Sequence, residues 1–213
     1  PSAPDGSGTA LAFYMEAAAP APILPLEHPN QVVSCRFSNI GRFGVYLDGP
    51  GTAVGVVYSV YHGKGPGRHL DHAAAVKNGA RLGIYQTEVT GCSGRIGGTG
   101  SSGLLIATGS GPASRARITG CNIHDNDTGI RVGTGPDQDD GSWVQVKHCR
   151  LFDNRIGIDS STILGESKAV MNWWGSNNGA GDASRGSHPL PAEPSLKVQL
   201  AVAQMAGNQP VKV

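Results

Sequence analysis

The sequence predicts an all-β solenoid, a fold in which short strands coil around one axis. Residues 118–130 and 146–158 repeat one pattern 28 residues apart (118 to 146), and such a period indicates stacked supersecondary units. Apolar residues alternate with polar ones inside each copy, and this period of two is typical of strands. The 32 glycines and the low charged fraction of 15% suit short strands joined by tight turns.

The first 31 residues differ from the rest, and we expect an N-terminal cap or linker over residues 1–31. Alanine and proline are concentrated there. Residues 10–19 could form a short helix, which Pro20 and the prolines after it would end.

The four cysteines share one frame, because each follows an aliphatic residue by three positions. The pairs are Val32–Cys35, Val89–Cys92, Ile118–Cys121 and Val146–Cys149. The first interval is about twice the others, which predicts an unmarked copy with Val60 and Gly63 in the two places. About five coils follow, starting near residues 32, 60, 89, 118 and 146, with an irregular stretch over residues 60–88.

Equivalent residues of a solenoid stack at the strand spacing of about 4.8 Å, which explains a recurring small side chain. The favoured interpretation is a buried column of free thiols. A disulfide between neighbouring coils and a metal site are the alternatives, but the spacing matches no zinc motif. Asn39, Asn126 and Asn154 are expected at bends, where they tolerate left-handed backbone and could form an amide ladder. A positive φ is expected at the glycines that follow, which are Gly44, Gly129 and Gly157.

The segments CNIHDNDTGIRV (121–132) and CRLFDNRIGIDS (149–160) resemble repeats of the pectate-lyase-like superfamily. The segment VMNWWGSNNGAGD (170–182) is similar to an Asn-Trp-Trp-Gly motif found at the end of such bacterial helices. The resemblance covers residues 32–182 and implies a right-handed parallel β-helix. Residues 183–213 would be a tail, in which residues 196–202 could add a strand. Trp173 is expected to close the core, and Trp174 either packs below it or stays exposed to stack on a sugar.

The polar loop 62–72 is the first candidate site, since it interrupts the repeat. The resemblance implies chemistry on uronic-acid polymers, which needs cations for the carboxylate and a base for the α-proton. Lys64, Arg68 and His69 are the candidate catalytic residues. The candidate sugar contacts are His62, His72 and Trp174. A solvated loop and a histidine metal site are the alternatives.

The second candidate site is the loop 133–143, which carries three carboxylates. Asp137, Asp139 and Asp140 could bind calcium, and calcium is the one candidate cofactor. Ordinary turn chemistry is the alternative. The companion segments of galacturonan hydrolases are missing, so no hydrolase residues are assigned.

Composition narrows the function classes. The net charge of +1 provides no basic field for nucleic acid, and no apolar stretch could cross a bilayer. A signal peptide is not evident, as expected for a processed secreted chain. We expect an extracellular or cell-surface module that binds or modifies a polysaccharide. The alternative is a non-catalytic structural, adhesin or fibre subunit with contacts between copies.

Overall fold

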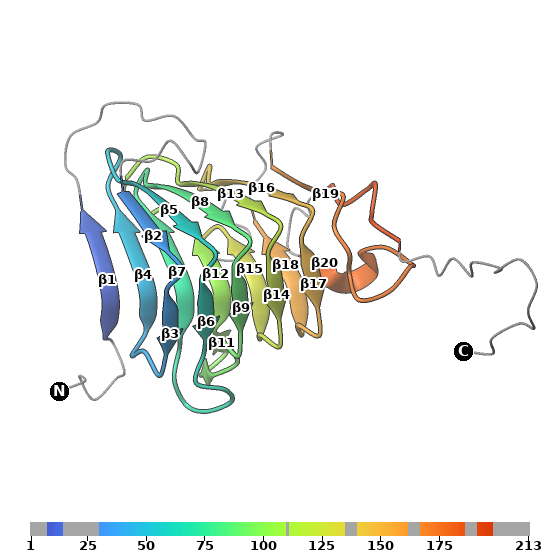
Figure 1. The fold of residues 1–213 in the computed structure, drawn as a ribbon, viewed down its shortest axis with the longest axis horizontal. Helices are drawn as coiled ribbons and strands as arrows, with labels where there is room; N and C mark the ends of the chain where they lie inside the picture. The colour runs from blue at the N-terminus through green and yellow to red at the C-terminus, as the bar shows by residue number, and fades with distance from the viewer. Residues whose placement is uncertain are drawn as a thin grey trace, which may run out of the picture.

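The computed structural model describes residues 8–14, 30–109, 111–134, 140–161, 167–185 and 191–197, which form a parallel β-solenoid (Figure 1). Three parallel sheets, named A, B and C here, run along its long axis. Sheet A contains β1 (Thr9–Tyr14), β4 (Phe43–Asp48), β7 (His72–Lys77), β12 (Ser102–Ile106), β15 (Thr128–Val132), β18 (Ile156–Ser160) and β20 (Ser184–Arg185). Sheet B contains β2 (Asn30–Val33), β5 (Ala53–Val57), β8 (Arg81–Tyr85), β13 (Arg115–Thr119), β16 (Trp143–Lys147) and β19 (Lys168–Val170). Sheet C contains β3 (Arg36–Ser38), β6 (Val60–His62), β9 (Glu88–Thr90), β14 (Asn122–His124) and β17 (Arg150–Phe152).

The chain passes through sheets B, C and A in that order, and one such passage is called a rung. Rungs 1 to 5 begin at β2, β5, β8, β13 and β16, so the chain completes about four turns from the first rung to the fifth. A small antiparallel hairpin, β10 (Arg95–Ile96) and β11 (Thr99–Gly100), projects from rung 3. A 3₁₀ turn at Gly181–Ala183 precedes β20. No helix in the described ranges has the length and apolar character that crossing a bilayer requires.

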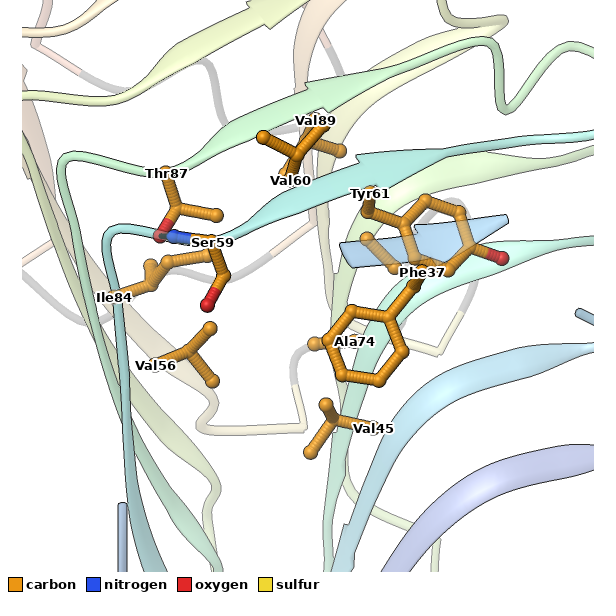
Figure 2. A pocket seen from close by; sticks show the side chains of 11 residues that line it. Phe37, Val45, Val56, Ser59, Val60, Tyr61, Ala74, Ile84, Thr87 and Val89 are labelled. Atoms are coloured by element: carbon orange, nitrogen blue, oxygen red, sulfur yellow. Dashed lines mark hydrogen bonds between the residues drawn. The ribbon is translucent and has the colours of Figure 1, made fainter. Parts of the chain in front are cut away.

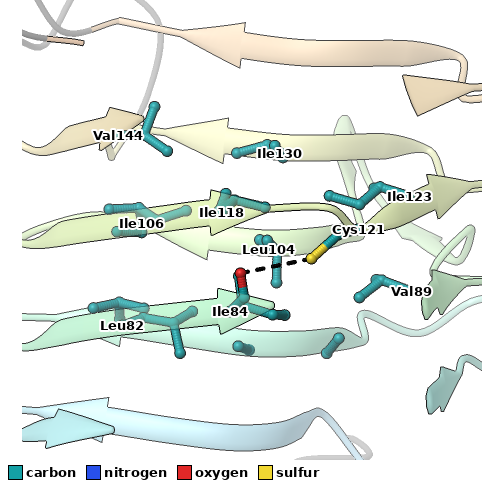
Figure 3. Close-up of a cluster of buried hydrophobic side chains, with 14 of the residues drawn as sticks. Leu82, Ile84, Val89, Leu104, Ile106, Ile118, Cys121, Ile123, Ile130 and Val144 are labelled. Carbon is teal, nitrogen blue, oxygen red and sulfur yellow. Dashed lines mark hydrogen bonds between the residues drawn. The ribbon is translucent and has the colours of Figure 1, made fainter. Parts of the chain in front are cut away.

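Aliphatic side chains from the three sheets fill the interior of every rung. In sheet B, one inward column consists of Val32, Val56, Ile84, Ile118 and Val146, which pair in register. Isoleucine and leucine side chains from neighbouring rungs meet in the centre (Figure 3). Burying each such side chain stabilises the fold by about 1.5–3 kcal/mol before entropy is counted.

This column corrects the predicted register of rungs 2 and 3. Val56 and Ile84 are the residues equivalent to Val32, not Val60 and Val89. The period is irregular because loops of unequal length, residues 63–71 and 91–101, connect sheet C to sheet A in these two rungs.

A ladder of small side chains follows the corner between sheets B and C (the corner ladder). Its members are Cys35, Ser59, Thr87, Cys121, Cys149 and Asn172. In four steps the backbone N–H of one member donates to the side chain of the next, and the donor–acceptor pairs are Cys35 to Ser59 Oγ (3.1 Å), Ser59 to Thr87 Oγ1 (3.3 Å), Cys121 to Cys149 Sγ (3.4 Å) and Cys149 to Asn172 Oδ1 (2.9 Å). The thiol or hydroxyl of each of the first five members also donates to the carbonyl two residues earlier. At Cys149 the thiol therefore supplies one acceptor and one donor as well as packing volume.

The expected column of cysteines is only partly correct. All four thiols are free, and three of them lie in the corner ladder. Cys92 lies instead at the corner between sheets C and A, where its N–H donates to Asn126 Oδ1 at 2.9 Å. Asn126 in turn donates its N–H and its side-chain amide to Asn154 Oδ1, at 3.1 and 3.0 Å, which confirms an amide ladder for these two residues.

The backbone conformation at the predicted asparagine and glycine bends differs from expectation. Left-handed backbone occurs at Asn39 and at Asp125 and Asp153, which precede the two stacked asparagines. The glycines that follow lie inside strands with no positive φ, because the constraint there is space. A Cβ on Gly129 would lie 2.6 Å from the carbonyl oxygen of Gly157.

The two ends of the solenoid also differ from expectation. Residues 9–14 form β1, which joins sheet A beside β4, so the helix predicted over residues 10–19 is wrong where the structure describes it. The predicted strand at 196–202 falls mostly outside the described residues. Trp174, not Trp173, packs into the core at the C-terminal end, and it is 6% exposed. Asn172 holds the corner place that had been expected for Trp173.

Candidate functional site

Two of the three candidate catalytic residues in the loop that follows β6 are bonded to backbone carbonyl groups. Lys64 Nζ donates to the carbonyl oxygen of Gly41 and so ties the loop to rung 1. The His69 ring lies 3.1 Å from the carbonyl of Gly65 in its own loop, and Arg68 is exposed. Lys64 therefore fixes the loop to the scaffold, and the catalytic role of the three candidates stays a prediction.

The two histidines predicted as sugar contacts lie in different environments. His62 is exposed on the outer face of sheet C, whereas His72 is 3% exposed. The His72 ring stacks on Phe43 with centroids 5.5 Å apart, and its Nδ1 lies 2.8 Å from Ser102 Oγ. Burial and nearby cations lower the pKa of His72 to about 3, against the opposing effect of a hydrogen bond from the ring to the Ser102 backbone carbonyl. His72 is therefore a neutral, enclosed residue at neutral pH.

A buried carboxylate anchors the same loop from inside. Asp71 is fully buried, its Oδ2 accepts the Lys64 N–H at 2.9 Å, and its own N–H donates to Ser101 Oγ at 3.0 Å. Burial, with smaller contributions from Cys92 and Asp71, raises the pKa of Tyr61 well above its ordinary value. Tyr61 also borders a small apolar cavity of about 10 Å³ inside rungs 1 to 3, beside Phe37 of the neighbouring strand (Figure 2). A space of this size holds at most one water molecule, so it is not a ligand site.

A charged cluster near sheet A is paired internally. Asp127 accepts from Arg155 Nε at 2.7 Å and from Arg95 Nη1 at 2.7 Å. Burial would raise the pKa of Asp127, but the two guanidinium groups outweigh it and hold that pKa below the ordinary value. The two arginines therefore neutralise a carboxylate of this chain.

The calcium prediction is only partly within the described structure. Asp137 and Asp139 lie outside the described residues. Both oxygens of Asp140 accept backbone N–H groups, from Thr108 at 2.8 Å and from Ser142 at 2.9 Å, as in an ordinary turn. No group of three or more His, Cys, Asp or Glu side chains among the described residues is arranged to hold a metal ion. Calcium binding by this loop stays a prediction.

A groove crosses the corner between sheets B and C over rungs 2 to 4 (the corner groove). Its volume of about 370 Å³ lies in the range of small-molecule sites, about 300–1,000 Å³. It is lined by Tyr58, Ser59, Val60, Gln86, Thr87, Glu88, Gly120 and Asn122. The lining residues occupy the same three corner positions in rungs 2, 3 and 4, except that Cys121 does not line the groove.

The corner ladder determines which side chains form the walls. One wall comes from the residues just before the ladder, Tyr58, Gln86 and Gly120, whose φ values are +51°, +43° and +67°. Left-handed backbone costs an ordinary residue about 1–2 kcal/mol, which the surrounding hydrogen bonds must offset. Gly120 has no side chain, so the groove remains open at rung 4. The other wall is a column of β6, β9 and β14 residues, Val60, Glu88 and Asn122 in register.

The groove offers an aromatic face beside two side-chain amides and one carboxylate. Tyr58 is 61% exposed, more than any other large hydrophobic residue in the described part of the chain. The side-chain amides of Gln86 and Asn122 make no hydrogen bond to another described residue, and each can both donate and accept. The Glu88 carboxylate lies 3.5 Å from His124 Nε2 and its side chain is 43% exposed. A ligand with one apolar face and many hydroxyl groups would match this surface.

The sequence interpretation missed all the groove residues. Tyr58, Gln86 and Gly120 share no side-chain chemistry, and they become equivalent only when the rungs are aligned on Val56 and Ile84. A usable signal was present, namely a small hydroxyl or thiol residue three positions after each of those aliphatics.

No family model matches the chain, and no curated protein or solved structure was found to match it. The parallel β-solenoid is shown by its own strand pairing. Function must therefore be argued from the geometry of this molecule.

Proposed function

We propose that this protein binds an extracellular polysaccharide through the corner groove without cleaving it, and that it is related to the pectate-lyase-like β-helices. The supporting observation is the exposed Tyr58 ring in rung 2, followed along the groove by the side-chain amides of Gln86 in rung 3 and Asn122 in rung 4, which bond to no other described residue. Strands in neighbouring rungs are about 4.8 Å apart, close to the length of one sugar ring in an extended chain. Successive rings of a glycan lying along the axis would each meet one rung.

Binding is favoured over modification by the groups that line the groove. Glu88 is the one carboxylate among its described lining residues, whereas glycoside hydrolysis commonly uses two. Lys64, Arg68 and His69 lie on a different loop, where Lys64 and His69 bond to backbone carbonyl groups. The amides and the aromatic ring can recognise a sugar but supply no acid–base pair.

A structural role is the second candidate, supported by the edge of sheet A. In the described part of the chain β1 is the terminal strand of that sheet, and its Leu11 is 37% exposed. Exposed edge strands can pair with another copy. Sedimentation at increasing concentration tests this role, and a strictly monomeric protein would argue against it.

The binding proposal is tested with a panel of neutral and acidic polysaccharides, with and without calcium. We expect retardation of the protein in gels containing at least one polymer. Tyr58→Ala should abolish it, and Tyr58→Phe, which keeps the ring, should retain it. Absorbance of unsaturated product should stay flat throughout. Failure to bind any polymer, or full binding by Tyr58→Ala, would overturn the proposal.

A further inference from the structure

One exposed arginine beside the groove is held by aromatic rings and not by a carboxylate. The guanidinium carbon of Arg150 lies 4.9 Å from the ring centre of Phe152 and 5.3 Å from that of Trp173. These two rings are 5.6 Å apart, and His124 stacks on Phe152 at 4.7 Å. The stack thus orients the guanidinium on the outer face of sheet C.

Among the described arginines that lie over aromatic rings, Arg150 is the exposed one, whereas Arg42 and Arg117 are half-buried. Arg95, Arg131 and Arg155 each pair with an aspartate. For Arg150 the described residues supply neither an ion pair nor a side-chain hydrogen bond, and the residue is exposed. A guanidinium stacked on rings keeps its N–H groups free in its own plane, where they can grip a carboxylate with two parallel hydrogen bonds.

The position of Arg150 continues the wall of the corner groove. Glu88, Asn122 and Arg150 are register partners in consecutive rungs of sheet C. Arg150 therefore lies one rung, about 4.8 Å, beyond the last groove residue of this column. In rung 5, His148 occupies the corner position that Gly120 occupies in rung 4. Because His148 has a side chain there, the groove ends at rung 5.

We propose that the polysaccharide is a mixed one, in which an acidic sugar places its carboxylate on Arg150 while neutral sugars occupy the corner groove. The inference rests on the proposed function and specifies its ligand. Glu88 lies two rungs before Arg150 on the same wall, and its negative charge disfavours a carboxylate there. A polymer made only of uronic acids would meet this repulsion, whereas a neutral chain with spaced acidic units would not.

The test compares glucuronoxylan with its carboxyl-reduced form, which has the same backbone and no charge. We expect the native polymer to bind about tenfold more tightly at low salt, as for one charged hydrogen-bonded contact. The advantage should shrink as salt rises. Arg150→Gln should bind both forms equally, at the affinity of wild type for the reduced form. Arg115→Gln, which removes an exposed arginine at the far end of a sheet B strand, should keep the preference.

The outcomes separate the two proposals. Equal binding of the two forms by wild type, a preference that survives Arg150→Gln, or binding of neutral polymers only would overturn the Arg150 site and leave the groove proposal intact. Both proposals would be supported if Tyr58→Ala lost binding to both forms of the polymer and Arg150→Gln lost only the preference for the native form.

Discussion

The backbone N–H of Cys121 donates a hydrogen bond to the sulfur of Cys149, 3.4 Å away in the next rung. Two rungs of the same corner use Ser59 and Thr87 in the equivalent places, with acceptor distances of 3.1 and 3.3 Å. Thiol and hydroxyl groups thus serve as alternatives in one ladder, because each offers an acceptor to the rung before it and a donor to its own strand.

Replacing the thiol of Cys149 tests this role. Cys149→Ala leaves the N–H of Cys121 buried without its acceptor, which should lower the free energy of unfolding by about 1–3 kcal/mol. Cys149→Ser keeps an acceptor and should cost less. Urea denaturation of both variants measures the difference, and a serine variant no more stable than the alanine variant would contradict the ladder.

Space, not backbone conformation, should determine the response at Gly129. A Cβ there would lie 2.6 Å from the carbonyl oxygen of Gly157, so Gly129→Ala should destabilise the protein by about 1–3 kcal/mol. Gly98→Ala is the matched control, because its Cβ would meet no atom within 4 Å. That control should stay within about 0.5 kcal/mol of wild type. Similar melting temperatures for the two variants would refute the steric argument.

His72 should make stability depend on pH in a defined window. Its pKa is about 6.5 in an unfolded chain and about 3 in the fold, so the native state favours the neutral ring. The stabilisation is complete above pH 6.5 and is lost as pH falls toward 3, by up to about 1.4 kcal/mol per unit. Asp127, whose pKa is also lowered, loses its stabilisation only below its ordinary value of 3.8.

The variant His72→Gln removes the titrating ring. Urea denaturation between pH 7 and 4.5 should then show a flatter slope than wild type. An unchanged slope would assign the acid sensitivity of this window to other groups.

Much of the scaffold was predictable from the repeat. The alternation around Ile118 and Val146 gave the correct strands and the correct stacking of rungs 4 and 5. The alignment failed in rungs 2 and 3, because the corner accepts Ser59 and Thr87 as readily as cysteine. Cys92, which appeared to mark rung 3, lies at a different corner.

The candidate site was less accessible to sequence reasoning. The polar loop 62–72 drew attention because loops carry function, yet Lys64 and Asp71 there hold the loop to the scaffold. The corner groove depends on which side chains point outward from a left-handed residue, and on the missing side chain of Gly120. Neither property corresponds to a residue type that recurs in the repeat. The groove can therefore be recognised only when the rungs are aligned in register.

Filling the groove at Gly120 should block binding without unfolding the protein. Asparagine tolerates left-handed backbone, and equivalent corners already carry Gln86 and His148. The new Cβ would lie 3.3 Å from Gln86 Cγ, a flexible neighbour. We expect Gly120→Asn to lower polysaccharide affinity at least tenfold while its melting temperature falls by only a few degrees. Undiminished affinity would place the ligand elsewhere.

Amide chemical shifts would locate a glycan bound in the corner groove. A ¹⁵N-labelled sample is titrated with an oligosaccharide of the polymer that binds best. We expect the backbone amides of Gly120, Gln86 and Tyr58 to shift together in a saturable way, with those of His72 and Arg95 unchanged. Shifts concentrated around His72 in sheet A and Arg95 in the β10–β11 hairpin, or no shifts at saturating ligand, would show that the glycan does not lie in the groove.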